Sequence, residues 1–357
     1  MKINFIAPGL YKSGGMRVIY EISNGLANKG HDVTLYSPII PYNSFKGIST
    51  FYAYKFYYWT LGSVFMNRKN VKYFNSGKFR LKNVLTINNH YISDADVVIA
   101  TAWPTAFSVK KLSQNKGEKF YFIQGYETWN SNINKVHESY ELGLNSITTC
   151  KYLQKLIFNK FGVKSEKIFC GIDFNLFSNP QKKYTIARTI TFIHNGQEKK
   201  NIPAAIRILE VIKSKFPEIK IVSFGTMAYP GLPEYFTTYI NPSEEEIKNI
   251  YCNSDIFLFT SKEEGFGLPP SEAMACKAAV VTTNVGAIPE YCENGFSAFV
   301  HEVSDENGMI ESIEKLITDP ELLKYISENG YNSVKEKFDW QKSINKFEKY
   351  LLQNLSL

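Results

Sequence analysis

Two glutamates, Glu264 and Glu272, lie on either side of a short Gly-Phe-Gly turn in the second half of the sequence. A carboxylate only accepts hydrogen bonds, so each glutamate suits a pair of neighbouring hydroxyls, such as those of a sugar or a ribose. The apolar run 255–260 before the turn predicts a buried strand, and the run 271–277 after it, rich in Ala, Met and Glu, predicts a helix. The spacing therefore predicts that the two carboxylates surround the place where a strand ends and a helix begins.

The turn itself has the composition of a loop that holds a phosphate. Gly265 and Gly267 allow a ligand to approach the backbone closely, while Pro269 and Pro270 end the strand and preset the first turn of the helix. The N–H groups and positive potential of a helix N-terminus favour a phosphate. The combination indicates a site for a sugar joined to a nucleoside diphosphate. The alternative is that the second glutamate only caps its helix and the first lies in a solvated loop.

The stretch 261–290 resembles the retaining glycosyltransferases of family 4, which carry two glutamates separated by seven residues. The resemblance implies an α/β protein with the GT-B fold, in which two Rossmann-like domains face each other across a cleft and a C-terminal helix returns to the N-terminal domain. It also implies that Glu264 lies beside the donor sugar as a catalytic residue and that Glu272 holds the ribose. The backbone amides that it implies for donor binding are those near Phe266, Gly267 and Leu268.

The loop 195–203 carries a second set of candidates for donor binding. In the resembled family this loop usually has Gly-Arg followed by a lysine, directed at the diphosphate. Here Gly196 and Lys199 or Lys200 match, whereas Gln197 replaces the arginine, so a point charge remains while the bidentate guanidinium is lost. The resemblance implies that Gly196, Gln197 and Lys199 bind the donor. Lys200 is assigned to catalysis, because a lysine here would meet the charge of the departing diphosphate.

The N-terminus predicts a strand at 3–7, a helix at 16–28 and a strand at 33–36. Gly14 and Gly15 at the head of the helix can bring backbone N–H groups to an anion, although a tight turn explains them as well. In the resembled family a loop here faces the donor diphosphate, so both glycines are candidate donor-binding residues. A nicotinamide enzyme would need G-x-G-x-x-G in this loop and an acid closing the second strand, and the sequence has neither.

Two further predicted strands, 97–100 and 119–123, each end in an unusual loop. Ligand sites of parallel sheets collect at the carboxyl ends of the strands, so these loops are candidates for the acceptor site. Their aromatic rings can stack on sugar faces, and their amide and carboxylate groups can bind hydroxyls. The candidates are Trp103, Gln124, Tyr126 and Glu127, with Trp129 beside them. The alternative for each aromatic is packing in the core. Many members of the resembled family have a histidine near the position of Gln124.

A length of 357 residues is comfortable for two domains. The segment 171–177 resembles the passage of the family into its second domain, and the segment 338–352 resembles its terminal helix. We therefore expect an acceptor-side domain of residues 1–172 together with 338–357, and a nucleotide-sugar-binding domain of residues 173–337.

Within the second domain, strands are predicted at 189–194 and 220–224. The spacing of Ser and Glu in 243–246 predicts a capping box at the start of a helix. The loop 239–242 falls where relatives of this fold hold the nucleobase, and 286–290 resembles a Gly-Gly-x-x-Glu turn of the family.

The composition is that of an ordinary globular protein, with 44% hydrophobic and 21% charged residues. Five scattered cysteines without a Cys-x-x-Cys pair predict neither a disulfide framework nor a zinc site, which fits a reducing cytosol best. No basic and then apolar signal pattern opens the sequence, and no long uncharged apolar stretch is present. We therefore expect a cytoplasmic protein that is neither exported nor integral to a membrane.

Charge is concentrated at the N-terminal end. Residues 1–90 contain twelve Lys or Arg and two acids, a net charge of +10 in a chain whose total is +7. Such a region attracts an anionic partner, and the aromatic stretch 51–66 beside it suggests a peripheral position at the inner face of an anionic membrane. The alternative is that these aromatics pack in the first domain and the cations are solvated. Nucleic acid is not indicated, because no recognition motif accompanies the basic region.

The resemblance and the residues together predict a retaining, metal-independent glycosyltransferase of the type that builds bacterial cell-surface polysaccharides. It would move a hexosyl or deoxyhexosyl unit from a UDP-, dTDP- or GDP-linked sugar to a glycan or lipid-linked glycan, with no further cofactor. One alternative is a non-catalytic partner with the GT-B fold that binds glycans or an active transferase, which the glutamines at 124 and 197 would favour. Another is a sugar-nucleotide epimerase with the same fold.

Overall fold

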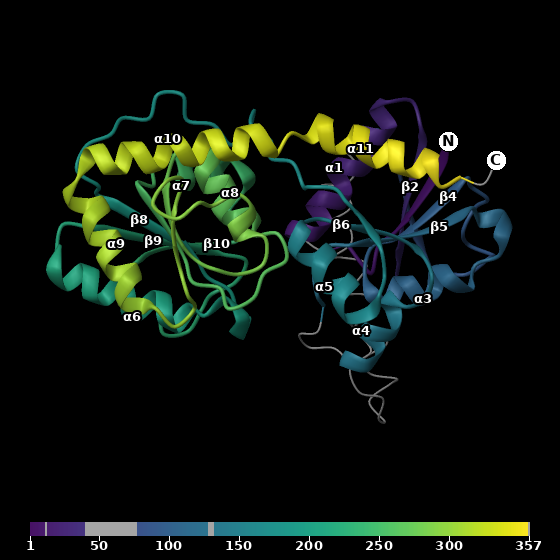
Figure 1. The fold of residues 1–357 in the computed structure, drawn as a ribbon, viewed down its shortest axis with the longest axis horizontal. Helices are drawn as coiled ribbons and strands as arrows, with labels where there is room; N and C mark the ends of the chain where they lie inside the picture. The colour runs from purple at the N-terminus through teal and green to yellow at the C-terminus, as the bar shows by residue number, and fades with distance from the viewer. Residues whose placement is uncertain (11–12, 40–76, 128–131, 356–357) are drawn as a thin grey trace. The chain divides into compact units, whose positions relative to one another are not determined.

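The computed structural model describes residues 1–10, 13–39, 77–127 and 132–355 (Figure 1). Contacts divide the chain into two compact units. The first unit is Met1–Cys170 together with Trp340–Leu357, and the second unit is Gly171–Asp339. The aromatic stretch 51–66 and Trp129, which the sequence analysis singled out, lie outside the described residues.

The first unit is built on a seven-stranded sheet of order β3-β2-β1-β4-β5-β6-β7, in which neighbouring strands are parallel. Its strands are β1 (Lys2–Ile6), β2 (Asp32–Pro38), β3 (Arg80–Val84), β4 (Val97–Ala100), β5 (Glu118–Ile123), β6 (Asn145–Thr148) and β7 (Ser165–Lys167). Its helices are α1 (Gly14–Asn28), α3 (Trp103–Lys111), η2 (Gln114–Lys116), α4 (Ile133–Tyr140), α5 (Lys151–Phe161) and α11 (Trp340–Gln353). The strand order reverses direction between β1 and β4, which is where α/β sheets of this kind bind ligands.

The second unit repeats this plan with a six-stranded parallel sheet of order β10-β9-β8-β11-β12-β13. Its strands are β8 (Thr189–Ile193), β9 (Lys220–Gly225), β10 (Thr237–Ile240), β11 (Ile256–Phe259), β12 (Ala279–Thr283) and β13 (Phe299–His301). Its helices are η3 (Glu198–Lys200), α6 (Ile202–Lys215), α7 (Glu244–Cys252), α8 (Leu268–Ala275), η4 (Ile288–Glu290), α9 (Glu306–Thr318) and α10 (Pro320–Lys337). Here the order reverses between β8 and β11, the strands that lead into the loops of the candidate site.

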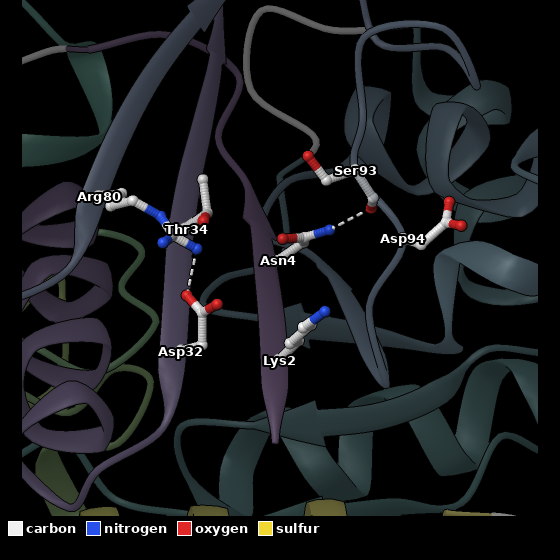
Figure 2. A pocket seen from close by; sticks show the side chains of 7 residues that line it. All are labelled: Lys2, Asn4, Asp32, Thr34, Arg80, Ser93 and Asp94. Carbon is white, nitrogen blue, oxygen red and sulfur yellow. Dashed lines mark hydrogen bonds and ion pairs between the residues drawn. The ribbon is translucent and has the colours of Figure 1, made fainter.

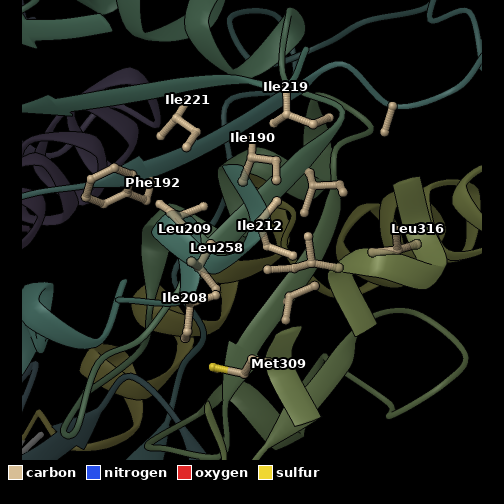
Figure 3. Packing of buried hydrophobic residues seen from close by; sticks show 14 of the residues in the cluster. Ile190, Phe192, Ile208, Leu209, Ile212, Ile219, Ile221, Leu258, Met309 and Leu316 are labelled. Carbon is tan, nitrogen blue, oxygen red and sulfur yellow. The ribbon is translucent and has the colours of Figure 1, made fainter. Parts of the chain in front are cut away.

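Alternating strands and helices build this fold because each parallel strand must be followed by a crossover, and the helices of the crossovers bury one stripe against the sheet. In the second unit, Ile190, Phe192 and Leu258 of the strands pack against Ile208 and Leu209 of α6 (Figure 3). Met309 and Leu316 of α9 complete the same buried cluster. The cluster fixes the strands, and through them the loops at their carboxyl ends.

The C-terminal helix α11 belongs to the first unit, as expected. Phe347 lies between Phe5 of β1 and Phe122 of β5, with ring centroids 6.2 Å and 5.5 Å away. Gly25 of α1 allows a close approach, since a Cβ there would stand 2.1 Å from Cδ1 of Ile344. Apolar packing thus attaches the last helix to the first strand.

The predicted strands agree with the structure to within two residues at each end, and the capping box of Ser243 and Glu246 is present at the start of α7. The helix predicted at 271–277 differs, since α8 begins at Leu268. Prolines occupy the first turn of a helix without loss, because the N–H groups there have no partner within the helix. The helix ends at Ala275, and Lys277 has the left-handed φ of +61°.

Among the helices in the described ranges, none is long and apolar enough to cross a membrane.

Candidate functional site

The two glutamates stand where the sequence analysis placed them, at the carboxyl end of a central strand of the second unit. The chain leaves β11 at Phe259, turns through the loop 260–267 and enters α8 at Leu268. Glu264 lies in the loop and Glu272 lies in the second turn of the helix. The loop that follows β8 supplies the remaining groups.

Glu264 pairs with Lys200 across 64 positions of the sequence. The Lys200 ammonium contacts Oε1 of the carboxylate, and the hydroxyl of Ser261 donates to the same oxygen at 2.9 Å. The two side chains are only 14% and 10% exposed. Electrostatic interactions are stronger here than on the open surface, because little water screens them. The alternative of a solvated loop glutamate is therefore wrong.

Backbone hydrogen bonds hold these two loops together. The N–H of Lys262 donates to the carbonyl of Lys199 at 2.7 Å. The hydroxyl of Thr260 donates to the carbonyl of Asn201 at 3.1 Å, and Thr283 of β12 donates to the carbonyl of Ser261 at 2.5 Å. The ion pair therefore rests on a fixed scaffold rather than on two flexible side chains.

The turn 285–291 supports the glutamate loop from the other side. Gly286 has φ +56°, and a Cβ there would stand 2.4 Å from the carbonyl oxygen of Glu264. The N–H of Ala287 donates to the carbonyl of Gly265 at 3.0 Å. The glycine of this turn is thus required both by its conformation and by the approach of the neighbouring backbone.

Gly267 is the N-cap of α8 and adopts φ +82°. Its carbonyl accepts a hydrogen bond of 2.7 Å from the hydroxyl of Tyr291. Because Pro269 and Pro270 have no N–H, Leu268 supplies the only backbone donor among the first three positions of the helix. The N-terminus of α8 thus offers an anion fewer donors than an ordinary helix, and the positive end of the helix dipole remains. Phe266 turns into the core, where its ring lies 4.9 Å from that of Phe338.

Glu272 is half-buried and accepts a hydrogen bond of 3.4 Å from the hydroxyl of Tyr251 on α7. Its place in the second turn is too far along the helix for an N-terminal cap. The interpretation of Glu272 as a capping residue is therefore wrong. Its carboxylate instead contacts α7 through the Tyr251 hydroxyl.

The candidates of the loop after β8 divide into an exposed and a half-buried group. Gly196 and Gln197 are exposed, and the N–H of Gln197 donates to Oδ1 of Asn195 at 2.9 Å. Lys199 and Lys200 are half-buried in η3, next to the glutamate loop. The structure thus brings both lysines, Glu264 and the Gly-Phe-Gly turn to one edge of the second sheet.

The sequence analysis missed three residues of this region. Ser261 and Tyr251 bind the two glutamates, as given above. His194, at the end of β8, is fully buried; its Nε2 lies 3.0 Å from the carbonyl oxygen of Met227, and its Nδ1 has no hydrogen-bond partner among the described residues. Burial lowers the pKa of His194, which keeps the ring neutral at pH 7. The one sequence feature that could have indicated His194 is its position directly before the loop 195–203.

The candidates in the first unit also lie at the carboxyl ends of strands. Gly14 and Gly15 open α1 after β1, and Ser13 caps that helix by accepting a hydrogen bond of 3.3 Å from the N–H of Met16. A Cβ on Gly15 would stand 3.3 Å from Oε1 of Gln124, which follows β5. The structure therefore brings the glycine loop and the Gln124 loop together.

Local contacts engage the other acceptor candidates. Glu127 accepts a hydrogen bond of 2.8 Å from the N–H of Trp103, the first residue of α3, whose N-cap Ala102 has no side chain for this role. The hydroxyl of Tyr126 lies 2.6 Å from Nε2 of His137, and the two rings stack. Glu127 thus acts as the cap of α3, and Tyr126 is part of the packing between β5 and α4.

A small polar hollow in the first unit lies away from these residues. It is lined by Lys2, Asn4, Asp32, Thr34, Arg80, Ser93 and Asp94 (Figure 2). Lys2, Asp32 and Arg80 begin β1, β2 and β3, Thr34 and Asn4 follow two positions later, and Arg80 forms an ion pair with Asp32. The candidate residues occupy the opposite, carboxyl ends.

Comparison with known proteins identifies the domain that carries the glutamates. Residues 173–333 match the family described as "Glycosyl transferases group 1". The second unit is a group 1 glycosyltransferase domain. The matched residues include Lys200, Glu264 and Glu272.

Sequence relatives of the chain include two bacterial enzymes. The chain is 31% identical over 161 residues to the capsular polysaccharide biosynthesis glycosyltransferase CapM of Staphylococcus aureus, which covers 43% of this chain and 42% of CapM. It is 24% identical over 231 residues to the N-acetyl-alpha-D-glucosaminyl L-malate synthase of Bacillus anthracis, which covers 60% of this chain and 56% of that enzyme. The chain thus spans about half the length of these curated relatives.

Among solved structures, the chain resembles HepE of Anabaena, solved in complex with UDP and glucose. The TM-score is 0.75, with 13% identity, over 99% of this chain and 100% of HepE. At this identity the likeness concerns the fold alone, and it confirms the expected GT-B fold with two Rossmann-like units.

Proposed function

We propose that the chain is a retaining glycosyltransferase that moves a hexosyl or deoxyhexosyl unit from a nucleoside diphosphate sugar to a glycan or lipid-linked glycan. The observation that carries this proposal is the Lys200–Glu264 pair beside the start of α8, with Glu272 one turn further along the helix. A cation, two carboxylates and a glycine turn on one sheet edge match the parts of such a donor. The family match of the second unit supports the same conclusion.

Each group has a chemical task in this proposal. Lys200 and Lys199 meet the diphosphate, whose negative charge grows as its bond to the sugar breaks. Glu264 accepts hydrogen bonds from hydroxyls of the transferred sugar, and Glu272 accepts them from the ribose. When no donor is bound, the ion pair holds the Lys200 side chain in one conformation. The side chain therefore loses less conformational entropy when it binds the diphosphate.

The reaction itself follows from this arrangement. The acceptor hydroxyl attacks the anomeric carbon from the face that the diphosphate leaves, so the configuration at that carbon is retained. The new C–O bond forms, the bond to the diphosphate breaks, and the acceptor proton passes to the departing phosphate oxygen. The charge of the leaving group is met by lysines and backbone N–H groups, without a metal ion.

Replacing Glu264 with Gln tests the proposal, because the amide keeps the shape and loses the charge. We expect acceptor-dependent release of nucleotide to fall about 100- to 1,000-fold, the range found when one preorganised electrostatic group is removed from an active site. Glu263→Gln is the matched control, since its side chain is exposed and next in sequence. Equal rates in the two variants would contradict the role of Glu264.

A titration of the unmodified protein with UDP, dTDP and GDP separates this proposal from its alternatives. A transferase should bind one of these nucleotides. The corresponding nucleotide sugar should then release its nucleotide only when an acceptor is present. Failure of all three to bind would favour a non-catalytic glycan-binding or transferase-binding partner. Turnover of the sugar nucleotide without acceptor would favour an epimerase.

We further propose that the acceptor lies at an anionic membrane. Residues 142–165 contain no acid, and the exposed face of α5 within them presents Lys151, Lys155 and Phe158, the last 50% exposed. Cations beside aromatics suit the headgroup region of anionic lipids, and each cation contributes about 1 kcal/mol near such a surface. These residues add to the positive charge of residues 1–90.

Flotation with vesicles tests this part. We expect binding to vesicles with phosphatidylglycerol at low salt, loss of binding as salt rises, and weaker binding for Lys151→Gln with Lys155→Gln. Equal partitioning on neutral and anionic vesicles would favour an acceptor in solution.

A further inference from the structure

The two contacts of the Glu264 carboxylate are both made to the same oxygen. The Lys200 ammonium lies against Oε1, and the hydroxyl of Ser261 donates to Oε1 at 2.9 Å. Among the described residues, none donates a hydrogen bond to the other oxygen, Oε2. Each oxygen of a carboxylate can accept about two hydrogen bonds. Lys200 and Ser261 therefore occupy Oε1, and Oε2 remains for a ligand.

Ser261 is a donor whose position is fixed by the loop around it. The residue is buried, and its carbonyl accepts a hydrogen bond of 2.5 Å from the hydroxyl of Thr283. The N–H of the next residue, Lys262, donates to the carbonyl of Lys199 at 2.7 Å. A single staggered torsion connects the backbone of a serine to its oxygen, so a fixed backbone leaves the hydroxyl few positions. The hydroxyl of Ser261 thus stands beside Glu264 before any ligand arrives.

Lys200 differs from Ser261 because its ammonium has a second task. The ammonium lies against Glu264 and 5.3 Å from the centroid of the Phe259 ring. In the proposed function it also binds the diphosphate of the donor, so its three N–H donors are then shared between two anions. The Ser261 hydroxyl has one proton to donate, and that proton goes to Glu264. The contact of Ser261 can therefore persist while the leaving group departs.

We propose that Ser261 is a positioning residue of the transfer reaction. Its hydroxyl holds Oε1 of Glu264, so that Oε2 is the oxygen that accepts hydrogen bonds from hydroxyls of the transferred sugar. This inference rests on the proposed function, in which Glu264 binds the donor sugar. A displacement of about 1 Å in an active site can cost about 100-fold in rate. One hydrogen bond that fixes a carboxylate can therefore have a measurable effect on transfer.

Ser261→Ala tests this role, because it removes the hydroxyl and leaves the hydrogen bonds of the backbone in place. We expect the kcat for acceptor-dependent release of nucleotide to fall about tenfold. Affinity for whichever of UDP, dTDP or GDP binds should change less than about twofold, because a free nucleotide has no sugar at its diphosphate for Glu264 to hold. A loss of nucleotide affinity as large as the loss of kcat would overturn the proposal, since the whole site would then be disturbed.

Ser271→Ala is the matched control. Ser271 is also buried, and its hydroxyl donates a hydrogen bond of 2.8 Å to the carbonyl of Leu268 rather than to a glutamate. Each variant loses one buried hydroxyl and its hydrogen bond, so urea denaturation should show similar losses of stability. We expect the control to keep its kcat within about twofold. Equal losses of kcat in the two variants would assign a structural role to Ser261 and exclude the positioning role.

A double-mutant cycle shows whether Ser261 acts through Glu264. In the Glu264→Gln background, adding Ser261→Ala should lower kcat less than about twofold, because the charged group that the hydroxyl positions is already gone. A further tenfold loss in this background would mean that the two residues act independently, which contradicts the proposal.

A crystal structure of Ser261→Ala gives a readout that does not depend on activity. We expect the Glu264 carboxylate to move by about 1 Å or more, or to occupy several positions. A carboxylate in its original place would rule out a positioning role for Ser261. If the unmodified protein transfers sugar from no donor, the proposed function fails, while the crystal structure still decides whether Ser261 positions Glu264.

Discussion

Glu264 of the second unit contacts groups from several segments of the chain. Glu127 of the first unit instead accepts a hydrogen bond from the N-terminus of helix α3. Glu264 contacts Lys200 and Ser261, and the turn at Gly286 supports its backbone. Glu127 accepts one hydrogen bond from the N-terminus of α3. The first arrangement places a buried ion pair at a sheet edge, and the second stabilises a helix. Two acids that look alike in the sequence therefore differ in what their removal should affect.

The largest effect on stability is expected for Lys200→Met. The variant leaves the Glu264 carboxylate largely buried without its cation, which should lower the free energy of unfolding by about 2–3 kcal/mol. Adding Glu264→Gln should restore more than half of the loss, because the uncompensated charge is then gone. Urea denaturation measures both changes.

The matched control for Lys200→Met is Lys215→Met, which breaks a surface pair with Glu314. The Lys215 side chain is 53% exposed, and such pairs contribute about 0–1 kcal/mol. A loss at Lys215 as large as that at Lys200 would remove the distinction between the two kinds of ion pair.

Gly286→Ala should have the next largest effect and lower the free energy of unfolding by about 2 kcal/mol or more. A side chain at φ +56° is strained, and its Cβ would also meet the carbonyl of Glu264. Gly295→Ala is the comparison, because Gly295 has φ +75° with open space around it and should lose only about 1 kcal/mol. Thermal unfolding and the rate of transfer are measured together. Equal stability losses in the two variants would show that the close approach at Gly286 costs nothing.

Glu127→Gln should lower the free energy of unfolding by about 0.5–1 kcal/mol, because an amide oxygen still accepts the hydrogen bond but no longer carries charge at the N-terminus of α3. We expect the rate at saturating acceptor to change less than about twofold, because a residue that caps a helix does not contact the reacting groups. A large rise in the KM for acceptor, without a loss of stability, would assign Glu127 to the acceptor site instead.

The cysteines extend the comparison of the two units to thiols. Alkylation of Cys252 by iodoacetamide should rise with pH and reach half its plateau near pH 7, because only the thiolate reacts and its pKa is about 7. Lys248→Ala should move this midpoint to higher pH, since it removes a favourable charge and leaves Lys182, Cys276 and Glu272 in place. Cys170 of the first unit should stay unreactive over the same range. A midpoint near 9 in the unmodified protein would contradict the lowered pKa of Cys252.

Sequence patterns were sufficient for the fold and for the strand ends that carry the site. Apolar runs such as 97–100 located strands, because parallel strands are buried on both faces. The run 271–277 placed the helix too late because its Ala, Met and Glu content marks the helix interior, whereas the two prolines correctly indicated the first turn. The two glutamates were found from their spacing around the glycine turn.

The partners of the candidate residues could not be predicted from the sequence. Tyr251 reaches Glu272 only because α7 and α8 are folded next to each other, and nothing local in the sequence marks this contact. Ser261 lies in the same loop as Glu264, three positions before it, but a short spacing alone does not show which way its hydroxyl points. The role of Glu127 was missed for the same reason, since it caps a helix that begins 24 positions earlier. Local patterns report on neighbours in sequence, while the hydrogen bonds of Tyr251 and Glu127 join separate segments.

The position of α11 has a consequence for synthesis on the ribosome. The second unit, Gly171–Asp339, is one continuous stretch, so it can complete its core as soon as it has emerged. The first unit emerges earlier but waits for Phe347, which covers Phe5 and Phe122, until the last helix is made. Domains usually complete folding in the order of their synthesis. Here the order is inverted, and the N-terminal sheet keeps an apolar face open to chaperones until α11 has been made.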